Sequence, residues 1–191
     1  MLFFMPEYNF LQRKKDVLKK KDKSFAKSWD KKILKLCKKI NSMENYYTTS
    51  SCSGRVLLMV DQEKKGAGLF LWTKHEKIKK GEVECELKKL SGNDVVKFKC
   101  EPPIIHVVCK TLNDAEVLLE KGFRSGFKNS GIISIGKNIV VEIHGTEKLE
   151  FPVFRRGKIL VSLEFLEVVR GKSNKKLEKG WEMIEKILLK I

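Results

Sequence analysis

Hydrophobic residues recur at helical spacing in the first quarter of the chain, and then the period changes. The spacing predicts a basic helix over residues 10–25 and a second helix from about Trp29 to Met43, with Ile33, Cys37 and Ile40 on its apolar face. Short runs rich in aromatic, β-branched and aliphatic residues follow. They predict five strands, at residues 46–50, 56–60, 69–73, 95–100 and 104–109.

A helical pattern returns in the second half of the chain. Asn113 is placed to cap a helix that runs to about Lys121, and the glycine-rich segment GFRSGFKNSGI follows it. Two strand-like runs, at 132–135 and 139–143, are joined by a hairpin-like connection. The C-terminal region predicts a helix over residues 162–169, a break at 171–174 and a last helix that ends at Ile191.

Strands in the middle of the chain and helices at both termini predict the α+β class, with a mixed or antiparallel sheet. No linker or repeat divides the sequence, so we expect one domain over residues 1–191. Hydrophobic residues make up 42% and charged residues 34%, which is typical of a soluble globular protein. No run approaches the roughly 18 apolar residues of a membrane span, and no signal peptide is recognisable. We therefore expect a cytoplasmic protein without a membrane partner.

Lysine and arginine outnumber the acids 40 to 24, a formal charge of +16. Part of this excess lies in one N-terminal run from Arg13 to Lys23. An uncompensated positive charge indicates a polyanionic partner, which for an intracellular protein is most often nucleic acid. A surface that only keeps the protein soluble is the alternative.

The cysteines and glycines exclude several kinds of site. The five cysteines include no CxxC pair, so we expect reduced thiols and no metal. The pair Gly66 and Gly68 lacks the third glycine of a dinucleotide fingerprint, and Leu166 stands where a phosphate-binding loop needs its first glycine. A Rossmann dinucleotide site and a phosphate-binding loop therefore both lose support.

The segment YYTTSSCSGRVLL, residues 46–58, concentrates hydrogen-bonding groups. Ser50, Ser51 and Ser53 offer hydroxyls, Gly54 permits close backbone approach, and Arg55 presents a planar fork suited to carboxylate or phosphate. This set is suited to a small polar ligand. An ordinary polar turn between strands is the alternative.

Three blocks of sequence resemble one family. TTSSCSGR, EPPIIHVVC at 101–109 and SGFKNSGI at 125–132 are similar, in order and spacing, to the tRNA wybutosine-synthesizing protein 3 family. The resemblance implies methyl transfer from S-adenosylmethionine to ring nitrogen N4 of a 4-demethylwyosine-type base, which lies 3′ of the anticodon in phenylalanine tRNA. The alternative is a non-catalytic protein that binds the anticodon arm.

Methylation of a nitrogen that carries a proton benefits from a base, and histidine is suited to that role near neutral pH. His75 and His106 lie in segments that resemble family motifs and are the candidate catalytic residues. A structural role for His106, within a predicted strand, is equally open. His144 lies outside these motifs and is interpreted as a strand-end residue.

The remaining candidates are contacts to cofactor and substrate. The resemblance and the polar composition assign S-adenosylmethionine binding to Ser50, Ser51, Ser53, Gly54, Arg55, Glu101 and Ser130. They assign phenylalanine tRNA binding to Trp72, Lys128, Asn129, Arg124, Arg13 and Lys14. Core packing is the alternative for Trp72, and a strand-end salt bridge for Glu101. Lys128 replaces an arginine common in the family and loses its bidentate fork, unless Arg124 substitutes for it.

Overall fold

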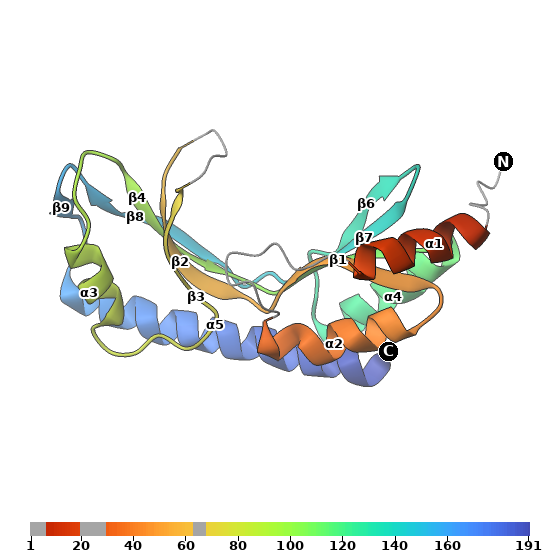
Figure 1. The fold of residues 1–191 in the computed structure, drawn as a ribbon. Helices are drawn as coiled ribbons and strands as arrows, with labels where there is room; N and C mark the ends of the chain where they lie inside the picture. Colours follow the sequence, from red (N-terminus) through yellow and green to blue (C-terminus); the bar gives the residue numbers. More distant parts are fainter. Residues whose placement is uncertain (1–6, 20–29, 63–67) are drawn as a thin grey trace. The chain divides into compact units, whose positions relative to one another are not determined.

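The structure, a computed structural model, describes residues 7–19, 30–62 and 68–191 (Figure 1). Its elements in chain order are α1 (Glu7–Leu18), α2 (Lys31–Ser42), β1 (Tyr46–Cys52), β2 (Arg55–Val60), β3 (Phe70–Lys74), α3 (Glu82–Lys88), β4 (Val96–Glu101), β5 (Ile104–Cys109), α4 (Leu112–Ser125), β6 (Gly131–Ile135), β7 (Ile139–His144), β8 (Leu149–Arg155), β9 (Lys158–Ile159) and α5 (Leu163–Lys190). Every strand pairing is antiparallel, which confirms the predicted α+β class and excludes a Rossmann fold.

The chain forms two compact units. Unit 1 comprises Met1–Ser53, Pro103–Thr146 and Trp181–Ile191, and unit 2 comprises Gly54–Pro102 and Glu147–Gly180. Each unit has its own sheet, with the order β1-β5-β7-β6 in unit 1 and β3-β2-β4-β8-β9 in unit 2. That residues 1–191 form a single domain stays a prediction. The two units are compact parts within that range.

The core of unit 1 lies on one face of its sheet. Alternation along β5 and β7 turns Ile105, Val107, Val141 and Ile143 toward helices α2, α4 and the end of α5. These helices contribute apolar side chains at helical spacing, namely Ile33, Leu36, Cys37, Ile40, Ala115, Leu118, Met183, Ile184 and Ile187. Figure 1 shows α2 and α4 on this side of the sheet and α1 on the other.

Among the described residues, helix α1 covers part of the opposite face of the unit 1 sheet. Phe10 of α1 packs on Tyr47, with ring centroids 5.3 Å apart, and both contact Val108. Because His106 alternates with the buried Ile105 and Val107, it faces this side of the sheet. The same face therefore carries an apolar half under α1 and a half with polar side chains.

Unit 2 is built around three consecutive buried residues of β2, Val56 to Leu58. Phe98 of β4 stacks on Phe151 of β8, which meets the edge of Phe165 in α5. In α5 the side chain of Asn174 bonds both the backbone N–H and the carbonyl of Ile78, at 2.8 and 3.0 Å. These contacts hold the first part of α5 to the segment before α3.

Several predicted boundaries were wrong. The cap of α4 is Thr111, which forms a reciprocal capping box with Asp114, and Asn113 is already inside the helix. Helix α5 is continuous through 171–174, because Ser173 is fully buried and the Asn174 side chain is held by Ile78, so packing outweighs the weak local helix propensity. Helix α3 and strands β8 and β9 were not predicted.

The other predicted elements agree with the structure to within a few residues. Strand β1 extends to Cys52, so the hydroxyl-rich segment is mostly strand and its turn is limited to Ser53 and Gly54. Of the predicted N-terminal helix, residues 20–25 lie outside the described residues. Among the described residues no helix is both long and apolar enough to span a membrane.

Candidate active site

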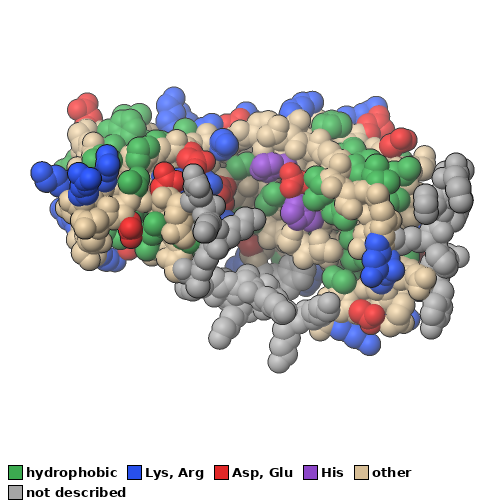
Figure 2. All heavy atoms as spheres, turned by 90° about the horizontal axis from the view of Figure 1, so that it is seen from above, with side chains coloured by type: hydrophobic (Ala, Val, Ile, Leu, Met, Phe, Trp, Pro, Cys, Tyr) green, Lys and Arg blue, Asp and Glu red, His purple; other side chains and the backbone are tan. Residues whose placement is uncertain are grey.

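Four polar side chains meet on the half of this face of the unit 1 sheet that lies beyond α1. The Ser50 hydroxyl lies 2.7 Å from His106 Nδ1, and His106 Nε2 lies 2.7 Å from Glu142 Oε2. The second Glu142 oxygen lies 3.6 Å from His144 Nδ1. The side chains of His106, Glu142 and His144 are 25 to 30% exposed, so a ligand can reach them. Figure 2 shows two histidine side chains beside an acidic one on the molecular surface.

The register of three strands creates this cluster. His106 of β5 is the direct partner of Glu142 in β7. On the other side, a β-bulge between Thr48 and Ser50 brings Ser50, rather than Thr49, opposite His106. The extra residue therefore selects which hydroxyl meets the imidazole.

The two contacts favour one tautomer of a neutral His106 imidazole. An ionised carboxylate only accepts hydrogen bonds, so Nε2 donates its proton to Glu142. Nδ1 of a neutral imidazole is then an acceptor, and the Ser50 hydroxyl donates to it. The hydroxyl, the imidazole and the carboxylate are connected in this order. The hydroxyl oxygen can therefore receive a proton while its own proton moves to the imidazole. Sequence reasoning missed Glu142, although a lone acid in the apolar run Ile139–Ile143 was a usable signal.

The loop after α4 is tied to the strand end that carries His144. The Ser130 hydroxyl accepts from the His144 backbone N–H at 3.0 Å and donates to the Phe127 carbonyl at 2.8 Å. The backbone N–H of Asn129 donates to the His144 carbonyl at 3.2 Å. Phe127 is fully buried and anchors the loop. The predicted loop residues thus adjoin the cluster, with the Ser130 hydroxyl already engaged in loop structure.

The remaining serines of the opening segment have different surroundings. The backbone N–H of Ser53 donates to Asp30 Oδ2 at 2.9 Å, but its hydroxyl is fully buried and has no hydrogen-bond partner in the described part of the chain. Burial raises the pKa of the Cys37 thiol to about 11, and its hydrogen bond with the Ser51 hydroxyl lowers it by a smaller amount. Ser51 is therefore engaged, whereas the buried Ser53 hydroxyl lacks a hydrogen-bond partner among the described residues.

In unit 2 the predicted residues Arg55 and Glu101 form an ion pair. They are direct partners on β2 and β4, with Arg55 Nε 2.8 Å from Glu101 Oε2, and Lys99 Nζ lies 3.0 Å from the other oxygen. Burial raises the pKa of Glu101, but Arg55 and then Lys99 outweigh it, and the net pKa lies below the ordinary value. The Arg55 guanidinium also lies 5.0 Å from the Phe70 ring centroid. The salt bridge left open as an alternative for Glu101 is therefore present.

The backbone conformation next to the ion pair of Arg55 and Glu101 requires glycine at position 54. The φ of Gly54 is +95°, and a β-carbon there would lie 3.0 Å from the carbonyl oxygen of Glu101.

Trp72 is half-buried on β3 opposite Leu58, and His75 is half-buried directly after that strand. The unit 2 candidates thus lie on or next to β2, β3 and β4.

Apart from Trp72, the predicted tRNA contacts lie on α1, at the end of α4 and in the loop that follows. Arg13 donates to the Lys137 carbonyl at 2.9 Å, and Lys14 donates to the Met43 carbonyl, so both tie α1 to unit 1. Arg124 pairs with Glu120 one turn earlier on α4, at 2.6 Å. Lys128 and Asn129 are exposed in the loop that follows.

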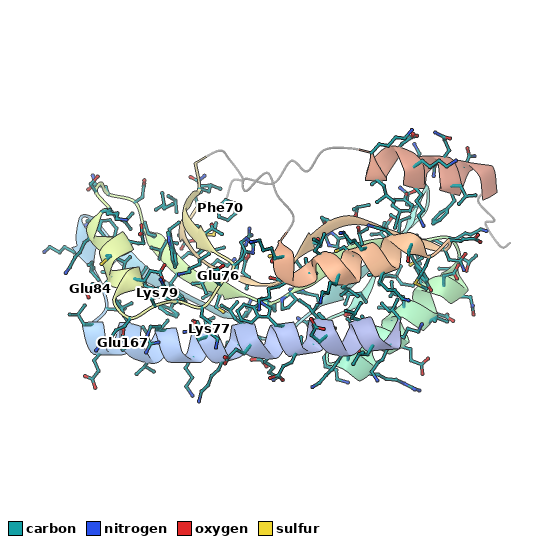
Figure 3. The ribbon with its side chains drawn as sticks, turned by 60° about the horizontal axis from the view of Figure 1, so that its bottom comes forward. Phe70, Glu76, Lys77, Lys79, Glu84 and Glu167 are labelled. Atoms are coloured by element: carbon teal, nitrogen blue, oxygen red, sulfur yellow. The ribbon has the colours of Figure 1, made fainter. Side chains whose placement is uncertain are left out.

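A shallow pocket of unit 2 contains none of the predicted site residues. It lies where α3 meets the start of α5, and Lys79, Glu84 and Glu167 line it (Figure 3). Its charged lining also includes Lys80 and Arg170, so residues of both signs surround it. The cysteines also offer no reactive site in the core: burial raises the pKa of Cys100 to about 11 and that of Cys109 to about 12, which keeps both thiols protonated.

The blocks that carry these residues match a known family. The model of the methyltransferase TYW3 family matches residues 12–191. The chain belongs to this family. The family predicted from the three sequence blocks is therefore confirmed.

Family relatives extend over nearly the whole chain. The tRNA wybutosine-synthesizing protein 3 homolog of Danio rerio is 36% identical over 93% of this chain and 72% of its own length. A protein of Thermococcus sibiricus named tRNA(Phe) 7-((3-amino-3-carboxypropyl)-4-demethylwyosine(37)-N(4))-methyltransferase is 36% identical, over 96% of this chain and 95% of its own. Among solved structures, the PH1069 protein from Pyrococcus horikoshii superposes with a TM-score of 0.89 at 34% identity, covering 100% of this chain and 97% of that one.

Proposed function

We propose that this TYW3-family protein is a tRNA methyltransferase, which transfers a methyl group from S-adenosylmethionine to N4 of a 4-demethylwyosine-type base in the anticodon loop of phenylalanine tRNA. The name of the Thermococcus sibiricus relative supports this choice of substrate. The observation that carries the proposal is the pair of 2.7 Å contacts that place His106 between Ser50 and Glu142. A tRNA substrate also agrees with the expected cytoplasmic location.

The cluster supplies a route for the proton that the acceptor nitrogen loses. When N4 gains a methyl group, its proton must leave for the product to be neutral. In our mechanism the Ser50 oxygen takes this proton as its own moves to His106 Nδ1, and the Glu142 carboxylate stabilises the resulting imidazolium. Positioning of the base is the remaining contribution of the protein. His106 is thus the candidate base. His75 stays a second candidate within unit 2.

The residues of unit 1 suit the methyl donor. S-adenosylmethionine supplies an electrophilic methyl group on a sulfonium, and its carboxylate and ribose require hydrogen-bonding partners. The unpaired Ser53 hydroxyl, fully buried, meets this need, since leaving it unsatisfied is costly. Ser50, Ser51 and Ser130 stay proposed contacts, with less capacity because each already has a partner. Gly54, Arg55 and Glu101 stay proposals that rest on the ion pair of unit 2.

For the tRNA, the exposed residues after α4 are the better-placed candidates. Lys128 and Asn129 lie in the loop joined to His144, so RNA bound there lies close to the cluster. Arg124 would have to exchange its pairing with Glu120 for a phosphate. Arg13 and Lys14 already donate to carbonyls, and Trp72 is half-buried on β3, so these three are proposed as weaker contacts.

The test is methyl incorporation into defined tRNA. Purified protein and radiolabelled S-adenosylmethionine are incubated with phenylalanine tRNA that carries 4-demethylwyosine, and with the same tRNA that carries guanosine. We expect incorporation only into the first, with the label at N4. Tight binding of both tRNAs without incorporation would instead support the non-catalytic anticodon-arm protein.

A further inference from the structure

Helix α2 presents a face of lysines without any acid. Its inner side buries Ile33, Leu36, Cys37 and Ile40 in the unit 1 core. All its charged residues are exposed lysines, namely Lys31, Lys32, Lys35, Lys38 and Lys39. We call Lys31, Lys35, Lys38 and Lys39 the α2 lysine face. Lys32 lies 4.5 Å from the ring centroid of Trp181 and already has a partner within the unit.

This arrangement is unfavourable for the helix itself. Lys31 lies in the first turn, where the partial positive charge of the helix terminus repels a cation. The pairs Lys31 with Lys35, and Lys35 with Lys39, are four residues apart and repel each other. A surface that needed only solubility would gain from acids at these spacings. Within the described residues, no salt bridge relieves any lysine of this face.

Four exposed lysines of unit 2 have acidic partners. Lys77 pairs with Glu178 and Lys179 with Glu147. Lys88 and Lys89 pair with acids of their own helix, Glu84 at 2.5 Å and Glu86 at 2.7 Å. Acids are thus placed beside some exposed lysines of the chain, whereas α2 contains none. These four paired lysines give a matched set for comparison with α2.

We propose that the α2 lysine face binds the phosphate backbone of the substrate tRNA, at nucleotides other than the one whose base is methylated. A polyanion offsets both the repulsion between these lysines and their repulsion from the helix terminus. Residues four apart lie about 6 Å apart along the axis, so the face forms a row of cations on a straight element. Contacts to phosphate position an RNA without reading its sequence. This inference rests on the proposed function, which supplies the tRNA.

The helix is rigidly joined to the strand that carries Ser50. Asn41 of α2 accepts the Thr48 backbone N–H at 2.8 Å, and its amide donates to the Thr48 hydroxyl at 3.0 Å. Asp30 caps the other end by accepting the Lys32 N–H at 3.1 Å. Strand β1 is an edge of the sheet, with α2 on one face and Ser50 on the other. RNA held by α2 therefore reaches the candidate active site by passing over this edge.

The experiment compares two variants with the same loss of charge. The test variant is Lys31→Gln, Lys35→Gln, Lys38→Gln and Lys39→Gln, since glutamine keeps helix propensity close to that of lysine. The matched control is Lys77→Gln, Lys88→Gln, Lys89→Gln and Lys179→Gln, which removes four ion-paired lysines. The dissociation constant for phenylalanine tRNA is measured at several salt concentrations, and kcat and KM for methylation at one.

We expect the test variant to bind tRNA at least about tenfold more weakly at 0.1 M salt, and the slope of log K against log salt to fall by about 3, since each phosphate contributes about 0.7 to 0.9. KM for tRNA should rise while kcat at saturation is unchanged. The control should change binding less than threefold. Thermal unfolding should show that the test variant is folded and no less stable, because repulsion is removed.

Equal weakening in both variants would overturn the proposal, since net charge alone would then explain it. If the fourfold variant fails to fold, Lys35→Gln with Lys39→Gln is compared with Lys88→Gln and Lys89→Gln, with half the change in slope expected. Wild-type protein that binds tRNA through the lysine face but methylates nothing would contradict the proposed function and leave the RNA surface standing. Normal methylation with an unchanged slope in the test variant would contradict only the RNA surface.

Discussion

His106 and Glu142 are direct cross-strand partners, and the imidazole Nε2 lies 2.7 Å from the carboxylate Oε2. This contact directs the other ring nitrogen, Nδ1, toward Ser50 as an acceptor. The tautomer that these contacts favour is the one that our proposed base requires. We propose that the carboxylate is a positioning residue that acts through the histidine.

We expect Glu142→Gln to lower kcat by about 10² or more. The glutamine amide donates to Nε2, which moves the ring proton to Nδ1 and removes the acceptor for Ser50. The measurement is single-turnover methylation across pH 5 to 9, together with tRNA and S-adenosylmethionine binding, which should be unchanged. The control is His144→Gln, which touches the same carboxylate but not Ser50, and should stay within about threefold of wild type. Equal losses in both variants would mean that the cluster is only structural.

We expect Ser53→Ala to weaken binding of S-adenosylmethionine by about five- to tenfold, measured by calorimetry. Its hydroxyl is buried without a partner in the described residues, so alanine should leave the free energy of unfolding unchanged or raise it by up to about 1 kcal/mol. Ser125→Ala is the control, because that buried hydroxyl already donates to the Lys121 carbonyl and is not among the proposed contacts. A stabilised Ser53→Ala protein with unchanged affinity would remove Ser53 from the donor site.

Gly54→Ala should lower the free energy of unfolding by about 1 to 3 kcal/mol, because φ is +95° and the new β-carbon meets the Glu101 carbonyl at 3.0 Å. Urea denaturation measures this change. Gly136→Ala is the control: its φ is not positive and its β-carbon would meet nothing within 4 Å. Equal stability of the two variants would show that the backbone at Gly54 relaxes without cost.

Because of the ion pair between Arg55 and Glu101, the free energy of unfolding should fall at acidic pH. The pKa of Glu101 lies below the ordinary 4.5 in the folded protein, so the stabilisation is complete above pH 4.5 and is lost as pH falls through the folded pKa. Glu101→Gln should thus have a lower free energy of unfolding than wild type at pH 7. This difference, here called the gap, should become smaller between pH 4.5 and pH 3. Urea denaturation at each pH measures it. Glu120→Gln, which removes an exposed acid, should show a smaller gap. A Glu101→Gln gap that is independent of pH would contradict the assignment.

Helix α5 shows where local pattern misleads. The run from Gly171 to Asn174 has weak helix propensity, and a break was expected there. In the structure Ser173 is fully buried and Asn174 bonds both backbone groups of Ile78, so the helix continues. Those partners lie almost a hundred residues earlier, where no local window includes them.

The sequence by itself determined the family, through three blocks in one order, and most strands, because the periods of 3.6 and 2 are local properties of the chain. It left two candidate histidines in different segments, with His75 slightly favoured over His106. Only the tertiary structure decided what His106 meets. Glu142 lies 36 residues beyond His106, and it is the antiparallel register that makes them neighbours. A single-residue bulge then decides that Ser50, not Thr49, completes the contact, because one extra residue changes the face to which every following side chain points.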